Sequence, residues 1–192
     1  MRCLSFPVVN QTAFLQRLRI HFRHGGLIAY PTESCFGLGC DPRNPRAVRR
    51  LLRLKARPQA KGLILIAAAA RQLHGYIAPL GEAQRRQVEA TWPGPNTWLI
   101  PAGPKAGRWL RGKHPALAVR VTAHPGAAAL CRVLGSALVS TSANLAGHRP
   151  LKTAAACRKA FGEQVLVVPG RIGGSRKPST IRDLASGRVI RG

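Results

Sequence analysis

Three cations that follow a predicted helix could bind a phosphate chain. The helix expected over residues 45–54 ends before Pro58, because proline cannot continue it, and Lys55, Arg57 and Lys61 follow in a loop. Lysine and arginine donors in one loop can converge on the oxygens of a single polyphosphate. The loop is therefore a candidate anion site.

A polar tail follows the strand expected over residues 137–140. It places three hydroxyls and an amide within residues 140–144. Alternate residues of an extended chain share a face, so Ser140, Ser142 and Asn144 can line one wall of a site. Such groups bind phosphates, a ribose or a base edge without adding charge. The alternative is a polar loop that opens the next helix, and composition alone does not separate the two.

Two further strand ends carry polar side chains. The strand expected over residues 116–121 runs into Arg120 and Thr122, and the strand over residues 27–30 is halted by Pro31 before residues 32–34, Thr-Glu-Ser. Ligands of open α/β sheets gather beyond the carboxyl ends of the strands, which makes both tails candidate pocket rims. Residues 32–34 could equally form a turn in which Thr32 or Ser34 caps the next segment.

The helix over residues 45–54 carries a stripe of arginines opposite an apolar face. Val48, Leu51 and Leu52 form the apolar side. Like charges three or four residues apart destabilise an isolated helix by about 0.2–0.5 kcal/mol per pair, and a bound polyanion would relieve that repulsion. The stripe is either a polyanion surface or a solvated face; its members are Arg46, Arg49, Arg50, Arg53 and Arg57.

Composition limits the chemistry that the chain can perform. Of its 192 residues, 31 are Lys or Arg and 6 are Asp or Glu, a formal net charge of +25, and 45% are hydrophobic. That hydrophobic content supports a core and argues against intrinsic disorder. Six carboxylates leave little for a two-metal centre or a glycosidase acid pair, whereas the positive excess favours polyanion partners. The carboxylates are Glu33, Asp41, Glu82, Glu89, Glu163 and Asp183.

Several common site motifs are absent from the sequence. It contains no Walker motif, no GxGxxG, no GxSxG and no CxxC pair, and its five cysteines are scattered. We therefore expect no metal site, no disulfide framework and no covalent catalysis, with Cys35 and Cys40 as packing residues. No apolar signal core develops at the start, and the apolar run over residues 63–70 is too short to span a bilayer. These features favour a reduced, cytoplasmic protein.

Helical and strand patterns alternate along the chain, without repeats or long linkers, which predicts a single α/β domain. A Gly-rich loop occupies residues 170–174. Expected helices cover residues 11–24, 45–54, 82–91, 126–134 and 153–161, and expected strands cover residues 27–30, 63–67, 97–100, 116–121, 137–140, 165–168, 180–184 and 188–191.

Taken together and in this order, the separated motifs resemble the YrdC-like family of threonylcarbamoyl-AMP synthases. The family's Lys-x-Arg and Ser-x-Asn signatures fall on Lys55, Arg57, Ser142 and Asn144. The matching segments are residues 28–33, 36–41, 54–58, 92–95, 118–121, 140–144 and 178–183. Several motifs in the right order are far more specific than any one of them.

The resemblance implies both a fold and a reaction. The expected fold is one YrdC-like domain over residues 8–192, of the short single-domain form, with a twisted mixed sheet, flanking helices and a concave basic face. The expected reaction joins L-threonine, bicarbonate or CO2, and ATP into threonylcarbamoyl-AMP and pyrophosphate. That reaction is the first step of the threonylcarbamoyl modification of adenosine 37 in tRNA.

The resemblance also implies roles for individual residues. The catalytic set is Lys55, Arg57, Ser142 and Asn144. The ATP contacts are Arg57, Lys61, Ser142, Asn144 and Arg191, with Lys55 beside them. The L-threonine pocket is Thr32, Arg120, Ser140 and Ser179. Phosphoryl chemistry of this kind depends on positioned cations rather than on a protein nucleophile, and Mg²⁺ would be held through the ATP phosphates, with no protein metal site.

Partners and one departure complete the expectation. tRNA is a candidate partner, as are the proteins that later transfer the threonylcarbamoyl group, and no membrane is involved. The rival interpretation is a non-catalytic RNA-binding or ribosome-maturation factor that uses the same concave basic face. Longer family members follow Lys-x-Arg with Pro-Leu and a His on the next strand, whereas this chain has Gly62-Leu63 and then Ile64, Leu65 and Ile66. Any threonine contact made by that His must come from elsewhere.

Overall fold

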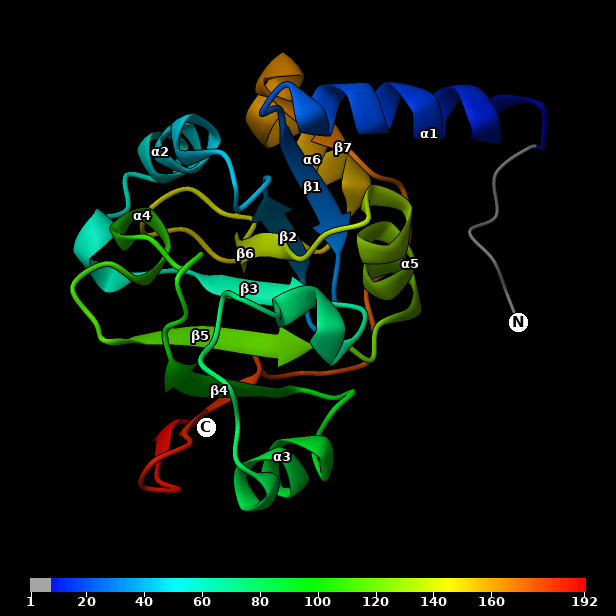
Figure 1. Ribbon diagram of the computed structural model, residues 1–192. Helices are drawn as coiled ribbons and strands as arrows, with labels where there is room; N and C mark the ends of the chain where they lie inside the picture. Colours follow the sequence, from blue (N-terminus) through cyan, green and yellow to red (C-terminus); the bar gives the residue numbers. More distant parts are fainter. Residues whose placement is uncertain (1–7) are drawn as a thin grey trace.

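A computed structural model describes residues 8–192, with side chains from residue 11 onward. Within these residues nine strands form one twisted mixed sheet in the order β7-β1-β2-β6-β3-β5-β4-β8-β9 (Figure 1). The strands are β1 (Leu27–Pro31), β2 (Phe36–Gly39), β3 (Ile64–Ala67), β4 (Asn96–Pro101), β5 (Ala116–Val121), β6 (Leu138–Ser142), β7 (Val165–Val167), β8 (Thr180–Asp183) and β9 (Val189–Arg191). The pairs β1–β7, β3–β5 and β4–β8 are parallel, and the other five are antiparallel.

Six α-helices and three short 3₁₀ turns flank the sheet in the described residues (Figure 1). The helices are α1 (Val8–Arg23), α2 (Pro45–Leu54), α3 (Glu82–Glu89), α4 (Arg108–Arg111), α5 (Pro125–Leu134) and α6 (Ala154–Phe161), and the turns are η1 (Gln59–Lys61), η2 (Ala70–Leu73) and η3 (Gly162–Gln164).

Strand periodicity divides the core between the two faces of the sheet. Along β1, Leu27 and Ala29 pack with α2, α4 and α6, whereas Ile28 and Tyr30 pack with α1 and α5. All five residues of β1 are buried. The central strands are therefore covered on both sides, which explains why they read as short continuous apolar runs in the sequence.

Helix α2 forms where the sequence places its signals. The Asn44 side chain accepts hydrogen bonds from the backbone amides of Arg46 and Ala47, and Pro45 occupies the first helical position. The apolar side is buried as expected, and each fully buried leucine contributes about 1.5–3 kcal/mol. The arginines of the opposite side are exposed.

The structure corrects the sequence-based elements at three places. The strand β2 was not expected, because glycine is depleted in strands and two of its four residues are glycine. Residues 32–35 form the turn of a β1–β2 hairpin, in which the Thr32 amide and hydroxyl both donate to the Cys35 carbonyl. The segment that follows is a strand, so the interpretation of Thr32 as a helix cap is wrong. Helix α1 begins three residues before the expected start.

Four cysteines in the described chain are free thiols. Cys40, Cys131 and Cys157 are buried and act as packing residues, as expected for Cys40, but Cys35 is only half-buried and reaches a cavity described below. Cys3 lies outside the described residues. No helix within residues 8–192 is both long and apolar enough to cross a membrane.

The glycine at position 39 allows β2 to approach β6. A Cβ atom there would lie 2.2 Å from the Val139 carbonyl oxygen, which is backbone and cannot move aside. We expect Gly39→Ala to destabilise the protein by about 1–3 kcal/mol, the usual cost of overpacking. Thermal unfolding should show a melting temperature lower by about 2–4 °C per kcal/mol. Gly174→Ala is the control, because nothing lies within 4 Å of a Cβ there; equal melting of the two variants would contradict the prediction.

Candidate active site

A cavity of about 710 Å³ opens on the face of the sheet beyond the cover of α1 and α5. Its volume lies in the range of small-molecule sites. Seven Lys or Arg residues and one carboxylate line it. The cations are Arg57, Arg120, Arg149, Lys152, Arg176, Lys177 and Arg191, and the carboxylate is Glu33. The concave face is therefore basic, as expected, and suits an anionic ligand.

Strand alternation builds the floor of this cavity. Leu138, Ser140 and Ser142 point to one face of β6, and the first packs under α5 while the two serines reach the open part. On the neighbouring strands, Ile64 and Arg120 lie on the same face and also line the cavity. On this face of the sheet, one end of a strand is therefore covered by helices and the other end lines the cavity.

A buried ammonium joins the end of α2 to the end of β6. Lys55 Nζ donates to the Ser142 carbonyl oxygen at 2.6 Å, to the Asn144 carbonyl oxygen at 2.8 Å and to Asn144 Oδ1 at 3.0 Å. Ser142 Oγ in turn donates to Asn144 Oδ1 at 2.6 Å. Burial, together with the Arg57 guanidinium, lowers the pKa of Lys55 to about 8, so the ammonium form prevails at neutral pH and all three of its protons are used.

The turn after α2 directs Lys55 and Arg57 to different targets. Ala56 adopts a left-handed conformation with φ of 45°, and the Arg57 amide donates to the Leu52 carbonyl, which ends the helix in a Schellman motif. Arg57 Nη2 donates to the Gly62 carbonyl at 2.9 Å while the residue lines the cavity. Burial and the nearby Arg191 lower the pKa of Arg57, a sign that its charge lacks an anionic partner.

A second buried charge lies at the end of β5. Arg120 Nη1 forms an ion pair with Glu33 Oε2 at 2.8 Å, and Thr122 Oγ1 donates to Glu33 Oε1 at 2.7 Å. Burial alone would raise the pKa of Glu33, but the Arg120 guanidinium and the Thr122 hydroxyl outweigh it, and the net shift is downward. Arg120 Nε is buried and finds no hydrogen-bond partner among the described residues.

The segment over residues 170–179 forms the far wall of the cavity. It is fastened to the hairpin turn by the Gly173 amide, which donates to the Thr32 carbonyl at 2.9 Å, and by the Ser175 amide, which donates to the Glu33 carbonyl at 3.1 Å. At its end, Ser179 Oγ accepts a hydrogen bond from the buried Thr97 hydroxyl at 2.9 Å. Arg191 Nη2 donates to the Ser179 carbonyl at 2.9 Å.

The structure brings most of the predicted site residues to one place. Those that line the cavity are Thr32, Arg57, Arg120, Ser140, Ser142, Ser179 and Arg191. Lys55 and Asn144 lie directly behind Ser142 and do not line the cavity themselves. Lys61 is exposed on η1 and also lies outside its lining.

Sequence reasoning missed several lining residues. Glu33 lies next to Thr32 in a segment already considered, and its pairing with Arg120 across 87 positions follows only from the fold. Arg149, Lys152, Arg176 and Lys177 come from irregular segments, where no periodicity marks them.

Comparison with known proteins defines the family of the chain. The family model Sua5/YciO/YrdC, described as "Telomere recombination", matches residues 21–192. The chain belongs to this family. Proteins called threonylcarbamoyl-AMP synthase from Chromobacterium violaceum and Methylobacillus flagellatus are 60% and 59% identical to it. The first alignment covers 96% of both chains, and the second covers 89% of this chain and 96% of the relative.

Solved structures of the Sua5/YciO/YrdC family share the fold. The structure of Escherichia coli YciO is 26% identical, with a TM-score of 0.81, over 94% of this chain and 89% of that chain. A P. abyssi Sua5 structure complexed with L-threonine is 28% identical, with a TM-score of 0.80, over 89% of this chain and 51% of that chain. The chain thus spans about half the length of that Sua5 protein.

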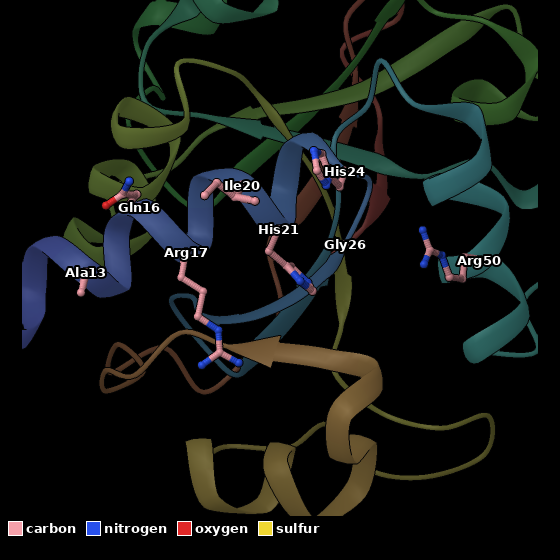
Figure 2. A pocket seen from close by; sticks show the side chains of 8 residues that line it. All are labelled: Ala13, Gln16, Arg17, Ile20, His21, His24, Gly26 and Arg50. Atoms are coloured by element: carbon pink, nitrogen blue, oxygen red, sulfur yellow. The ribbon is translucent and has the colours of Figure 1, made fainter.

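A second hollow lies between α1 and α2 in this family member. Figure 2 shows the side chains of Arg17, His21 and His24 on α1 or at its end, and that of Arg50 on α2. Arg50 Nη2 donates to the Gly25 carbonyl at 2.8 Å, and His21 Nε2 lies 2.9 Å from the Leu27 carbonyl oxygen. A third hollow on the surface of α2 is lined by Arg49, Arg53 and Arg57 among others, and Arg57 also lines the cavity. The arginine stripe therefore includes one residue of the candidate site.

Metal ligands do not gather in the part of the chain that the structure describes, where no three His, Cys, Asp or Glu residues lie close enough to hold an ion. In the cavity, both oxygens of Glu33 already face Arg120 and Thr122. The charge of the lining therefore suits an anionic ligand.

The ammonium of Lys55 should hold the loop after β6 in place. In Lys55→Met, three acceptors on Ser142 and Asn144 lose their donor, at a cost of about 1–3 kcal/mol. Hydrogen exchange of the amides in residues 142–148 should then be faster by about tenfold or more. Lys61→Met removes an exposed lysine and is the matched control. Unchanged protection in Lys55→Met would show that this network does not order the loop.

Proposed function

We propose that this chain is a threonylcarbamoyl-AMP synthase that joins L-threonine, bicarbonate or CO2, and ATP, with release of pyrophosphate. One observation carries the proposal: the Lys-x-Arg and Ser-x-Asn motifs, 87 residues apart in sequence, meet beside a cavity whose other wall holds Arg120 and Ser140. The relatives at 52–60% identity are called by that name, which supports it. We propose that one domain over residues 8–192 carries the activity, in the cytoplasm where tRNA is modified.

The threonine half of the site is proposed to lie over β1, β5 and β6. Arg120 would bind the threonine carboxylate, because it lines the cavity and a guanidinium is a strong and directional carboxylate ligand. Thr32, Ser140 and Ser179 would bind the remaining polar groups, and Thr97 holds the Ser179 hydroxyl in place. The complex of P. abyssi Sua5 with L-threonine, at 28% identity, is consistent with a threonine site in this family.

The ATP half is proposed to lie between the end of α2, the end of β6 and β9. Arg57 and Arg191 line this side of the cavity, and Ser142 is held between them and Lys55. Asn144 and Lys61 belong to the proposed contacts, although both lie outside the lining before ATP binds. In this proposal Lys55 orients Ser142 and Asn144 from behind.

The reaction needs charge stabilisation more than covalent chemistry. The threonine amine and bicarbonate form a C–N bond with loss of water, which gives a carbamate. A carbamate oxygen then attacks the α-phosphorus of ATP, a new O–P bond forms, the bond from the α-phosphorus to the bridging oxygen of the β-phosphate breaks, and pyrophosphate leaves. This step makes the enzyme a nucleotidyltransferase. Negative charge grows on the phosphate oxygens, where Arg57 and Arg191 supply preorganised positive charge, and Lys55 holds Ser142 and Asn144 beside them. Mg²⁺ would enter with the triphosphate, since the cavity carboxylate Glu33 is already paired.

We also propose tRNA as a partner, together with the proteins that transfer the product to it. The supporting observation is the run of exposed arginines from the α1–α2 hollow along α2 to Arg57. Neither α1 nor α2 contains an acidic residue. A non-catalytic RNA-binding protein would share this surface, so RNA binding alone cannot separate the two functions.

Measurement of turnover distinguishes the synthase from a non-catalytic RNA-binding protein. The purified protein should release pyrophosphate from ATP only when L-threonine and bicarbonate are both present. Arg57→Ala should abolish this release and weaken ATP binding in calorimetry by at least about tenfold, because it removes a charge-assisted phosphate contact. Arg53→Ala, with an exposed helical arginine, is the control.

A protein without threonine-dependent pyrophosphate release would be the binding module instead. If Arg57→Ala binds ATP like the parent protein while its thermal melt is unchanged, Arg57 is not an ATP contact.

The stripe on α2 should govern affinity for tRNA without affecting synthesis. Reversing Arg46 and Arg53 to Glu should weaken tRNA binding and reduce the slope of log affinity against log salt by about 0.9 per lost phosphate contact. Pyrophosphate release should stay at the parent rate. The control reverses Arg85 and Arg86 to Glu, which changes the net charge by the same amount. These two residues lie on α3, at the opposite end of the molecule from α2 (Figure 1). Equal losses in both variants would show that only net charge matters.

A further inference from the structure

We propose that Glu33 is a positioning residue for L-threonine: it holds the Arg120 guanidinium in the orientation in which that side chain, which lines the cavity, binds the threonine carboxylate. The inference rests on the proposed function and assigns a role to a residue outside the predicted site. Glu33 is the one carboxylate among the residues that line the cavity.

Arg120 depends on Glu33 for its charge balance. The side chain of Arg120 is 8% exposed and that of Glu33 is 13% exposed, and the Nη1 to Oε2 distance is 2.8 Å. A guanidinium this deeply buried is costly unless a carboxylate faces it. Within the described chain no other carboxylate forms an ion pair with Arg120, and its buried Nε has no hydrogen-bond partner. The pair thus holds the guanidinium through Nη1, while the Arg120 side chain also lines the cavity.

A chain of hydrogen bonds sets the position of the Glu33 carboxylate in turn. The His124 amide donates a hydrogen bond to Thr122 Oγ1 at 3.1 Å. The Thr122 hydroxyl in turn donates a hydrogen bond to Glu33 Oε1 at 2.7 Å. Arg120 and Thr122 lie two residues apart on one extended segment, so both side chains reach the same face. One carboxylate therefore bridges the two side chains: Oε1 accepts the hydrogen bond from Thr122, and Oε2 is ion-paired with Arg120.

The main chain of Glu33 serves a separate purpose. Its carbonyl oxygen accepts the Ser175 amide at 3.1 Å, which fastens the segment that ends at Ser179. A Cβ on Gly173 would lie 2.8 Å from the same oxygen, so the two backbones are in close contact. Substitution of the Glu33 side chain leaves this attachment intact, and the effect of the carboxylate on Arg120 can be tested by itself.

Two features argue against proton transfer by Glu33. Both carboxylate oxygens are already engaged, because Oε1 accepts the hydrogen bond from Thr122 and Oε2 is ion-paired with Arg120. The same donors lower the pKa of Glu33, whereas a general base that deprotonates the threonine amine would need a raised pKa. Glu33 therefore acts through Arg120.

The first test compares the KM for L-threonine with the KM for ATP in steady-state kinetics. Glu33→Gln keeps the shape of the side chain and removes its charge. The KM for L-threonine should rise about tenfold or more, while the KM for ATP stays within about twofold of the parent value. Glu33→Asp should recover part of the threonine affinity. Glu163→Gln, which removes an exposed carboxylate from η3, should change neither constant.

The second test is a double-mutant cycle with Arg120→Ala, read by calorimetric binding of L-threonine. If Glu33 acts through Arg120, Glu33→Gln should have no further effect once Arg120 is absent. Independent losses that multiply in the double variant would overturn the inference, as would a threonine KM of Glu33→Gln equal to that of the parent. If Glu33→Gln does not fold, Thr122→Val, which removes the donor to Glu33, should raise the threonine KM in the same way.

The two proposals fail in different ways. Parent protein with threonine-dependent turnover and an unaffected Glu33→Gln variant refutes only the role of Glu33. Parent protein without such turnover refutes the synthase function and this inference with it.

Discussion

The site depends on the ammonium of Lys55, which satisfies three oxygen acceptors at the end of β6. A lysine is suited to this position because it has three protons to donate and a side chain long enough to cross from α2 to β6. Burial costs the ammonium part of its hydration, and the three hydrogen bonds offset that cost. The helix end, the strand end and the loop after it therefore form one rigid unit around which the other parts of the cavity are arranged.

The second constraint is the near absence of acidic groups. With seven cations and one carboxylate at the cavity, the protein keeps mutually repelling charges close together before any ligand is present. Arg57, whose pKa is lowered by burial and by Arg191, lies where that repulsion is felt. An anionic ligand would relieve this repulsion between the cations, and that relief would contribute to the free energy of binding. The overall charge of +25 contributes less, because most of those cations lie elsewhere.

The extent of sequence-based prediction can be judged from particular residues. The ends of α2 and β5 were predicted closely, because proline punctuation and apolar periodicity are local signals. Strand β2 was missed, because its glycines serve a close approach to β6 that only the tertiary structure requires. The motif segments predicted which residues would gather, and seven of the predicted site residues line the cavity. Glu33 was missed for the opposite reason: its partner is 87 positions away, and no spacing reveals such a pair.

The position of β9 at the edge of the sheet has a consequence for the order of events during binding. Arg120, Ser140 and Ser142 stand on interior strands that are paired on both sides, whereas Arg191 stands on an edge strand whose neighbours Val189 and Ile190 are 52% and 59% exposed. Edge strands open more readily than central ones. The part of the cavity built on Arg120, Ser140 and Ser142 is therefore stiff before a ligand arrives and loses little conformational entropy on binding, while the Arg191 side adapts and must be ordered by the ligand. The same cavity thus combines a rigid floor on interior strands with a more adaptable edge at β9.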